Sequence, residues 1–111
     1  MEEILRQALL YDFYGELLTE RQKRVYEDVV LNDYSLSEVA GELGISRQGV
    51  HDMIRRCGKT LSEYEEKLHL VEKFVKMKNQ VGEIRRIASE HESEPEMVEI
   101  GRLTVGILEE L

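Results

Sequence analysis

The apolar residues of the N-terminal segment recur at the three- and four-residue spacing of one helix face. In EEILRQALLYDFYGELL these positions are Leu5, Ala8, Leu9 and Phe13. Glu2 and Glu3 stand where negative charge stabilises the N-terminus of a helix, and Gly15 is expected to end that helix. The pattern therefore predicts a first helix that closes near Gly15.

Two further helices begin with the signature of a capping box, in which the first and fourth residues bind each other's free backbone N–H groups. The pairs are Thr19 with Gln22 and Ser35 with Glu38. The apolar positions of the second helix are Val25, Tyr26, Val29 and Val30. Those of the third are Leu36, Val39, Ala40 and Leu43. The third helix should stop at Gly44, because glycine adopts the left-handed conformation at the least cost.

The connection between the third and fourth helices is very short. Only Gly44 and Ile45 separate the third helix from Ser46, a candidate N-cap for the fourth. So tight a turn disfavours antiparallel packing and predicts the steep crossing of a helix-turn-helix, with Ala40 at the closest approach. The predicted core of this motif is Val39, Ala40, Leu43, Gly44, Ile45, Val50 and Ile54.

A heptad seam continues beyond the motif, with apolar residues alternately four and three positions apart. Its members are Val50, Ile54, Cys57, Leu61, Tyr64, Leu68, Val71 and Val75. One long helix is the preferred prediction. The rival is a break near Gly58, where glycine costs about 1 kcal/mol relative to alanine, followed by a new start capped by Ser62 and Glu65. A second seam, on another face, consists of Leu70, Phe74, Met77, Val81 and Ile84.

A last helix is predicted after the polar segment SEHESEP. Ser93 and Glu96 flank Pro95 as a third candidate capping box, and proline suits the first turn of a helix. The apolar stripe that follows is Met97, Ile100, Thr104, Ile107 and Leu111. We predict a single all-α domain, with a sigma region 4-like helix-turn-helix part over residues 1–60. Residues 61–111 are expected to form a long-helix and C-terminal oligomerisation part.

The two seams and the C-terminal stripe exceed what one short three-helix core can cover. Because large exposed apolar patches mark association surfaces, the sequence predicts a homodimer, with the C-terminal helix as the preferred contact. The residues expected at this interface are Leu61, Tyr64, Leu68, Val71, Phe74, Val75, Ile100 and Ile107.

Charge is unevenly distributed along this chain of 111 residues, whose net charge is −8. Residues 46–60 hold four basic residues against one acidic residue, net +3, whereas residues 1–45 hold four against ten, net −6. Residues 90–111, with one arginine and seven glutamates, are also net −6. No apolar run is long enough to span a membrane and no export signal is present, so a cytoplasmic protein is expected.

The basic segment coincides with the outward face of the predicted fourth helix. Arginine and glutamine can bind guanine and adenine edges through paired hydrogen bonds, and a helix N-terminus suits a phosphate. The candidate nucleic-acid-binding residues are Ser46, Arg47, Gln48, His51, Asp52, Arg55 and Arg56. Three residues of the second helix can extend this face: Arg21, Lys23 and Arg24. The alternative is that these are solvated polar residues on a helix used for packing.

The motif carries a family resemblance. LTERQKRVYEDVVLNDYSLSEVAGELGISRQGVHDMIRR, residues 18–56, resembles region 4 of bacterial sigma factors, which reads promoter DNA. With LLYDFYGELLTERQ before it and LSEYEEKLHL after it, most of the chain is similar to the YlxM family, small sigma-region-4-like bacterial proteins encoded beside signal recognition particle genes. That resemblance implies a regulatory or accessory role in the signal recognition particle pathway, with components of that particle as partners, and no enzymatic activity.

The sequence contains little that indicates a catalytic or metal site. Glu66 and His69 form one E-x-x-H pair, but a di-iron site needs a second pair and two further inward glutamates. Cys57, the one cysteine, occupies a seam position and is expected to be a buried hydrophobe rather than a reactive thiol. We predict no enzyme, no cofactor and no metal.

Two classes of function remain. In the first, the fourth helix binds nucleic acid, either DNA or a structured RNA, in a regulatory role. In the second, the same fold is a non-catalytic interaction module, or an accessory factor of the signal recognition particle pathway, that does not bind DNA.

Overall fold

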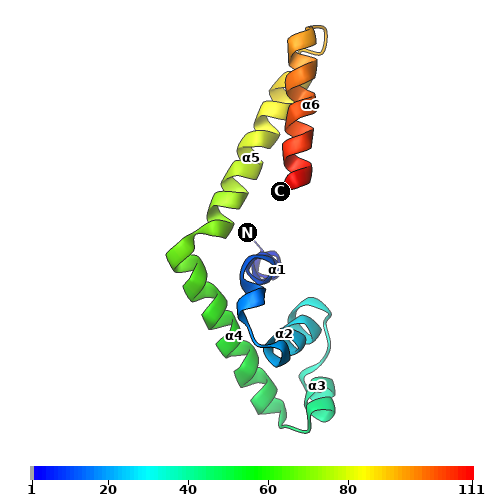
Figure 1. The fold of residues 1–111 in the computed structure, drawn as a ribbon. Coiled ribbons are helices and arrows are strands. Elements are labelled where there is room, and N and C mark those ends of the chain that lie inside the picture. The colour runs from blue at the N-terminus through cyan, green and yellow to red at the C-terminus, as the bar shows by residue number, and fades with distance from the viewer. Residues whose placement is uncertain (1) are drawn as a thin grey trace. The chain divides into compact units, whose positions relative to one another are not determined.

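The computed structural model describes residues 2–111, which form helices joined by short turns (Figure 1). The helices are α1 (Glu3–Tyr14), α2 (Glu20–Tyr26), α3 (Leu36–Leu43), α4 (Arg47–Leu68), α5 (Leu70–Ser89) and α6 (Pro95–Glu110). A 3-10 turn (Gly15–Leu17) follows α1, and a π-helical turn (Glu27–Leu31) follows α2. The prediction of an all-α fold with a helix-turn-helix is confirmed.

The chain divides into two compact units, one up to Val71 and the other from Glu72 to Leu111. The sequence-based division at residues 60 and 61 lies earlier, within α4. None of the described helices is long and apolar enough to cross a membrane.

The helix starts in the first unit follow the predicted caps. The Thr19 hydroxyl accepts a hydrogen bond from the backbone N–H of Gln22 (3.1 Å), and the Gln22 side chain accepts one from the backbone N–H of Thr19 (2.9 Å). The Ser35 hydroxyl accepts from the backbone N–H of Glu38 at 3.1 Å, but among the described residues the Glu38 side chain does not return the hydrogen bond, so only half of this predicted capping box forms. Gly44 ends α3 in the left-handed conformation, with φ of 68°. Local side-chain chemistry thus sets the ends of the motif helices.

The core of the helix-turn-helix lies where α2, α3 and α4 meet. Its buried residues are Val25, Val39, Ala40 and Val50. The partly buried hydrophobic residues packed against them are Val29, Leu36, Leu43, Ile45, Met53 and Ile54. This packing holds α4 with its opposite side in solvent, as the motif requires.

Backbone conformation, not space, should decide which residue is tolerated at the turn. Among the described residues, and apart from the adjoining backbone, neither Gly44 nor Gly41 has an atom within 4 Å of where a Cβ would stand, but only Gly44 of the two has a positive φ. We expect Gly44→Ala to lower the free energy of unfolding by about 1 kcal/mol, since left-handed backbone disfavours a Cβ. Gly41→Ala should raise it by about 0.5–1 kcal/mol through helix propensity. Urea unfolding of both variants checks this, and equal effects would exclude the conformational explanation.

Helix α1 packs on α4 in the same unit. Fully buried side chains in this region include Tyr14, Cys57 and Leu61. Burial raises the pKa of the Cys57 thiol. A raised pKa disfavours the thiolate, which is the reactive form of cysteine. Cys57 is thus a buried core residue, as its seam position predicts.

The long seam does not follow one helix. The chain is helical through Gly58, so the rival break there is wrong, but the preferred single helix to Val75 is also wrong because α4 ends at Leu68. His69 takes the left-handed conformation (φ 56°), and α5 begins at Leu70.

Hydrogen bonds from α1 fix this break. The Tyr14 hydroxyl donates to Glu65 Oε1 (2.6 Å) and accepts from the backbone N–H of Leu70 (3.2 Å). Glu65 Oε1 also accepts from the backbone N–H of Val71 at 2.9 Å. Two free N–H groups of the first turn of α5 are thereby satisfied, which a continuous helix would not need.

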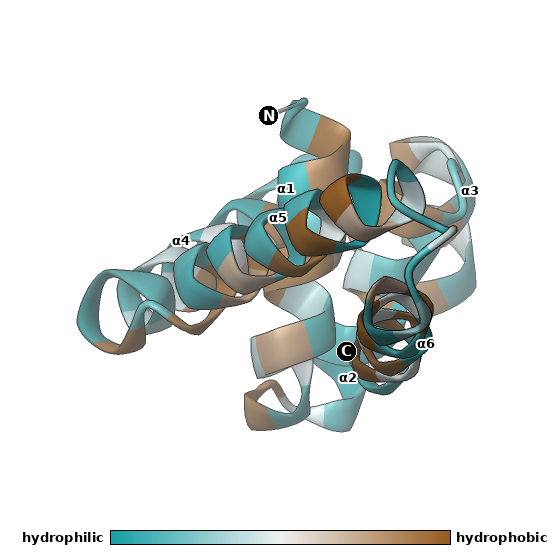
Figure 2. Cartoon of the chain, turned by 90° about the horizontal axis from the view of Figure 1, so that it is seen from above, coloured by the Kyte–Doolittle hydropathy of each residue, from teal (hydrophilic) through white to brown (hydrophobic). Residues whose placement is uncertain are grey.

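The second unit is a hairpin of α5 and α6. Helix α6 begins after Glu94, whose side chain makes no capping hydrogen bond, so the capping box expected from Ser93 and Glu96 is wrong, although Pro95 does occupy the first turn. Gly101 lies against Ala88, where a Cβ would stand 3.9 Å from the alanine methyl. Figure 2 shows hydrophobic residues along α6.

The residues expected at an oligomer interface divide by burial. Leu61 and Val71 are buried inside the first unit and expose almost no surface. Leu68, Ile100 and Ile107 are exposed. Partly buried are Tyr64, Phe74 and Val75. The heptad pattern does not separate these groups, because it continues across the end of α4 at Leu68.

Candidate nucleic-acid interface

The N-terminal half of α4 presents the polar face predicted from the sequence. Its exposed residues are Ser46, Arg47, Gln48, His51, Arg55 and Arg56, and Asp52 is partly exposed. Two shallow surface depressions lie along this face. One, of about 420 Å³, is lined by Leu36, Arg47, Gln48 and His51. The other, also about 420 Å³, is lined by Asp52, Arg55, Arg56 and Lys59. We call the residues Ser46, Arg47, Gln48, His51, Asp52, Arg55, Arg56 and Lys59 the α4 face. It is an exposed helix surface with cations along it.

The arginines of the α4 face are available to a ligand. Within the part of the chain that the structure describes, no ion pair holds Arg47, Arg55 or Arg56. Lys59 joins them, although it is not among the site residues predicted from the sequence. Its spacing was the available signal, since residues three and four apart share a helix face and Lys59 follows Arg55 and Arg56 at those distances.

Asp52 organises the polar residues at the centre of the α4 face. The Gln48 amide donates to Asp52 Oδ1 at 3.0 Å, which fixes the amide with its oxygen free to accept a hydrogen bond. His51 Nδ1 lies 4.0 Å from the same carboxylate oxygen. A negative group therefore stands among the cations, where it weakens attraction for phosphate and holds a candidate base-reading side chain in place.

Ser46 has a structural task as well as its place on the face. Its hydroxyl accepts a hydrogen bond from the backbone N–H of Gly49 at 3.0 Å and caps α4. A phosphate bound here would meet the N–H groups at the start of the helix and not an uncommitted hydroxyl.

The extension of this face onto α2 is smaller than the sequence analysis expected. The Lys23 ammonium is bound by Glu16 (2.8 Å) and Glu20 (3.3 Å), and only 15% of its side chain is exposed. The hydrogen bond that the ammonium donates to Glu16 is the main reason that the pKa of Lys23 is raised. Arg24 lies 3.6 Å from Glu42. Lys23 thus serves the fold and is not available to a phosphate.

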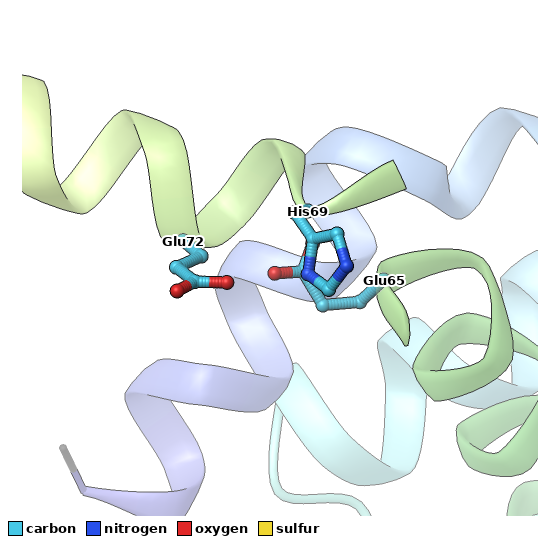
Figure 3. A group of neighbouring side chains, drawn as sticks. All are labelled: Glu65, His69 and Glu72. Atoms are coloured by element: carbon cyan, nitrogen blue, oxygen red, sulfur yellow. The ribbon is translucent and has the colours of Figure 1, made fainter. Parts of the chain in front are cut away.

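The histidine of the E-x-x-H pattern lies at the end of α4. Figure 3 shows Glu65 beside His69, with Glu72 opening the second unit. The carboxylate beside His69 is that of Glu65, four residues earlier in the chain. Glu65 is engaged by Tyr14 and Val71, which gives it a structural role.

Comparison with known proteins gives one family. The model of the family described as "UPF0122: Putative helix-turn-helix protein, YlxM / p13 like" matches residues 1–100. This match includes the whole helix-turn-helix and the start of α6.

Curated relatives are similar over most of their length. A UPF0122 protein of Thermoanaerobacter sp. (strain X514) is 42% identical over 113 residues, covering 99% of this chain and 97% of the relative. One from Acetivibrio thermocellus is 51% identical over 84 residues, with 76% and 72% covered. One from Shouchella clausii is 45% identical over 91 residues, with 81% and 84% covered.

Proposed function

Because the chain belongs to the UPF0122 family of YlxM/p13-like helix-turn-helix proteins, we propose that its α4 face binds nucleic acid in a regulatory role. The single observation that carries this proposal is the set of arginines on the outward side of α4, which form no ion pair with any residue that the structure describes. Arginines on a helix held this way meet phosphates and base edges in helix-turn-helix proteins.

The charges favour a modest affinity. Phosphate contacts supply most of the attraction between such proteins and nucleic acid, and here Arg47, Arg55, Arg56 and Lys59 are the four cations of the α4 face. Asp52 and the acidic flanks oppose them. We infer weak, salt-sensitive binding whose selectivity among sequences or shapes depends on Arg47, Gln48 and His51.

The setting of this activity follows from the resemblance to the YlxM family. We propose that the protein acts in the cytoplasm as a homodimer, in the signal recognition particle pathway, with DNA or a structured RNA as the ligand. The support is the family membership together with the basic α4 face. A homodimer would present two such faces, so that each contact raises the effective concentration of the other.

An anisotropy titration of the purified protein tests the nucleic-acid proposal. Labelled duplex DNA and a labelled structured RNA are titrated at roughly 50 mM salt, low enough for weak phosphate contacts to register. We expect saturable binding to one of them. If all four cations contact phosphates of a duplex, the slope of log affinity against log salt should be about −3.6. A folded protein that binds neither ligand would favour the interaction module instead.

A further inference from the structure

The hairpin of α5 and α6 leaves one of its faces uncovered. Between about a third and a half of each of several large apolar side chains is exposed there. They are Ile84 and Ile87 on α5 and Ile100, Leu103 and Ile107 on α6. We call these five residues the hairpin face.

Helix geometry places the five residues on one side of the hairpin. Ala88 on α5 and Thr104 on α6 are buried and mark the sides that face each other. Successive residues of a helix are rotated by roughly 100° about its axis. Ile84 and Ile87 therefore both lie to one side of the direction in which Ala88 points toward α6. On α6, Ile100, Leu103 and Ile107 are rotated in the same sense from the direction in which Thr104 points toward α5. Because the two helices run antiparallel (Figure 1), these flanks coincide and the hairpin face is continuous.

The second unit has only a small core of its own. Among residues 72–111, all of which the structure describes, only Ala88 and Thr104 are buried. Units of this size usually need disulfides, metals or oligomerisation, and the single cysteine lies in the other unit. Burying the hairpin face would supply the missing apolar contact.

Charge indicates what covers the hairpin face. Residues 72–89 hold five basic and two acidic residues, net +3, whereas residues 90–111 hold one basic and seven acidic residues, net −6. A second copy that places its α6 over α5 brings opposite charges together. A copy that places α5 over α5 and α6 over α6 brings like charges together, which costs free energy.

We propose that the hairpin face binds the same face of a second copy, with α5 of each chain against α6 of the other. The product is an antiparallel four-helix bundle related by a two-fold axis parallel to the helices. In this bundle Ile87 lies opposite Leu103 of the second copy. The proposal rests on the homodimer stated above and adds its surface and its pairing.

Sedimentation tests the surface. At tens of micromolar, sedimentation equilibrium of the parent chain should give a mass twice that of the 13.0 kDa monomer. Leu103→Glu, which puts a charge in the interface, should raise the dissociation constant roughly tenfold or more. Val98 is the matched control: it is 53% exposed against 51% for Leu103, but it lies on the other side of α6. Val98→Glu should leave the dimer intact.

Cross-linking tests the pairing. One variant carries Ile87→Cys, and a second variant, with a tag that gives it a different mass, carries Leu103→Cys. The parent chain, which holds only the buried Cys57, is the control for background cross-linking. A short thiol cross-linker should join the two variants when mixed and should not join either variant to itself. Self-joining of each variant would overturn the α5-to-α6 pairing.

Other outcomes are equally decisive. A monomeric parent would overturn both the homodimer and its surface. A dimer that survives Leu103→Glu would overturn the surface and leave the homodimer standing. Neither result decides whether the α4 face binds nucleic acid, which the titration tests separately.

Discussion

Reversing the charge of Arg55 and Arg56 together is expected to abolish nucleic-acid binding. The double change to glutamate removes two of the four cations of the α4 face and adds two anions beside Asp52. Each lost phosphate contact lowers affinity and flattens the salt dependence by about one unit of slope. We expect the affinity to fall at least about a hundredfold for every sequence, measured by anisotropy at low salt.

Two variants separate a local contact from a general charge effect. Lys67→Glu with Arg85→Glu changes the net charge equally at exposed positions outside the α4 face, and binding should remain within about threefold of the parent. Arg55→Lys with Arg56→Lys keeps the charges and should retain most of the affinity. If the Lys67 and Arg85 pair weakened binding as much as the Arg55 and Arg56 pair, the α4 face would not be the site.

Enlarging Ala40 is expected to be the most damaging change in the helix-turn-helix. Ala40 is buried in the cluster with Val25, Val39 and Val50, where α3 crosses α4. Three added carbons must push the two helices apart, so Ala40→Leu should lower the free energy of unfolding by roughly 1–3 kcal/mol. Urea unfolding followed by circular dichroism measures this loss.

The same side chain on the exposed side of α3 provides the control. Ser37 is solvent-exposed, and Ser37→Leu should change the stability by no more than about 0.5 kcal/mol. An Ala40→Leu variant as stable as Ser37→Leu would mean that the crossing has room for a larger residue. The close approach of α3 and α4 would then not depend on alanine.

Much of the first unit could be predicted because its helix ends are set by neighbouring residues. Thr19, Ser35 and Ser46 cap helices through contacts only three residues away, and Gly44 stops α3 through its own backbone freedom. Likewise, the outward position of Arg55 follows from the spacing of its apolar neighbours. Such short-range causes are visible in a sequence.

The break between α4 and α5 could not be predicted in this way. No glycine or proline marks it, and the heptad seam runs across it without interruption. Its cause is Tyr14, 56 residues before Leu70 in the chain. The pairing of Lys23 with Glu16 was missed for the same reason, because periodicity gives the face of a residue and not the partner that its side chain chooses.

The end of α4 is therefore decided by the first helix of the chain. The Tyr14 hydroxyl holds Glu65 Oε1, which accepts from the N–H of Val71, and itself accepts from the N–H of Leu70. The end of α4 thus depends on the docking of Tyr14 and not only on the residues around His69. A residue near the beginning of the chain therefore takes part in fixing where a helix synthesised much later comes to an end.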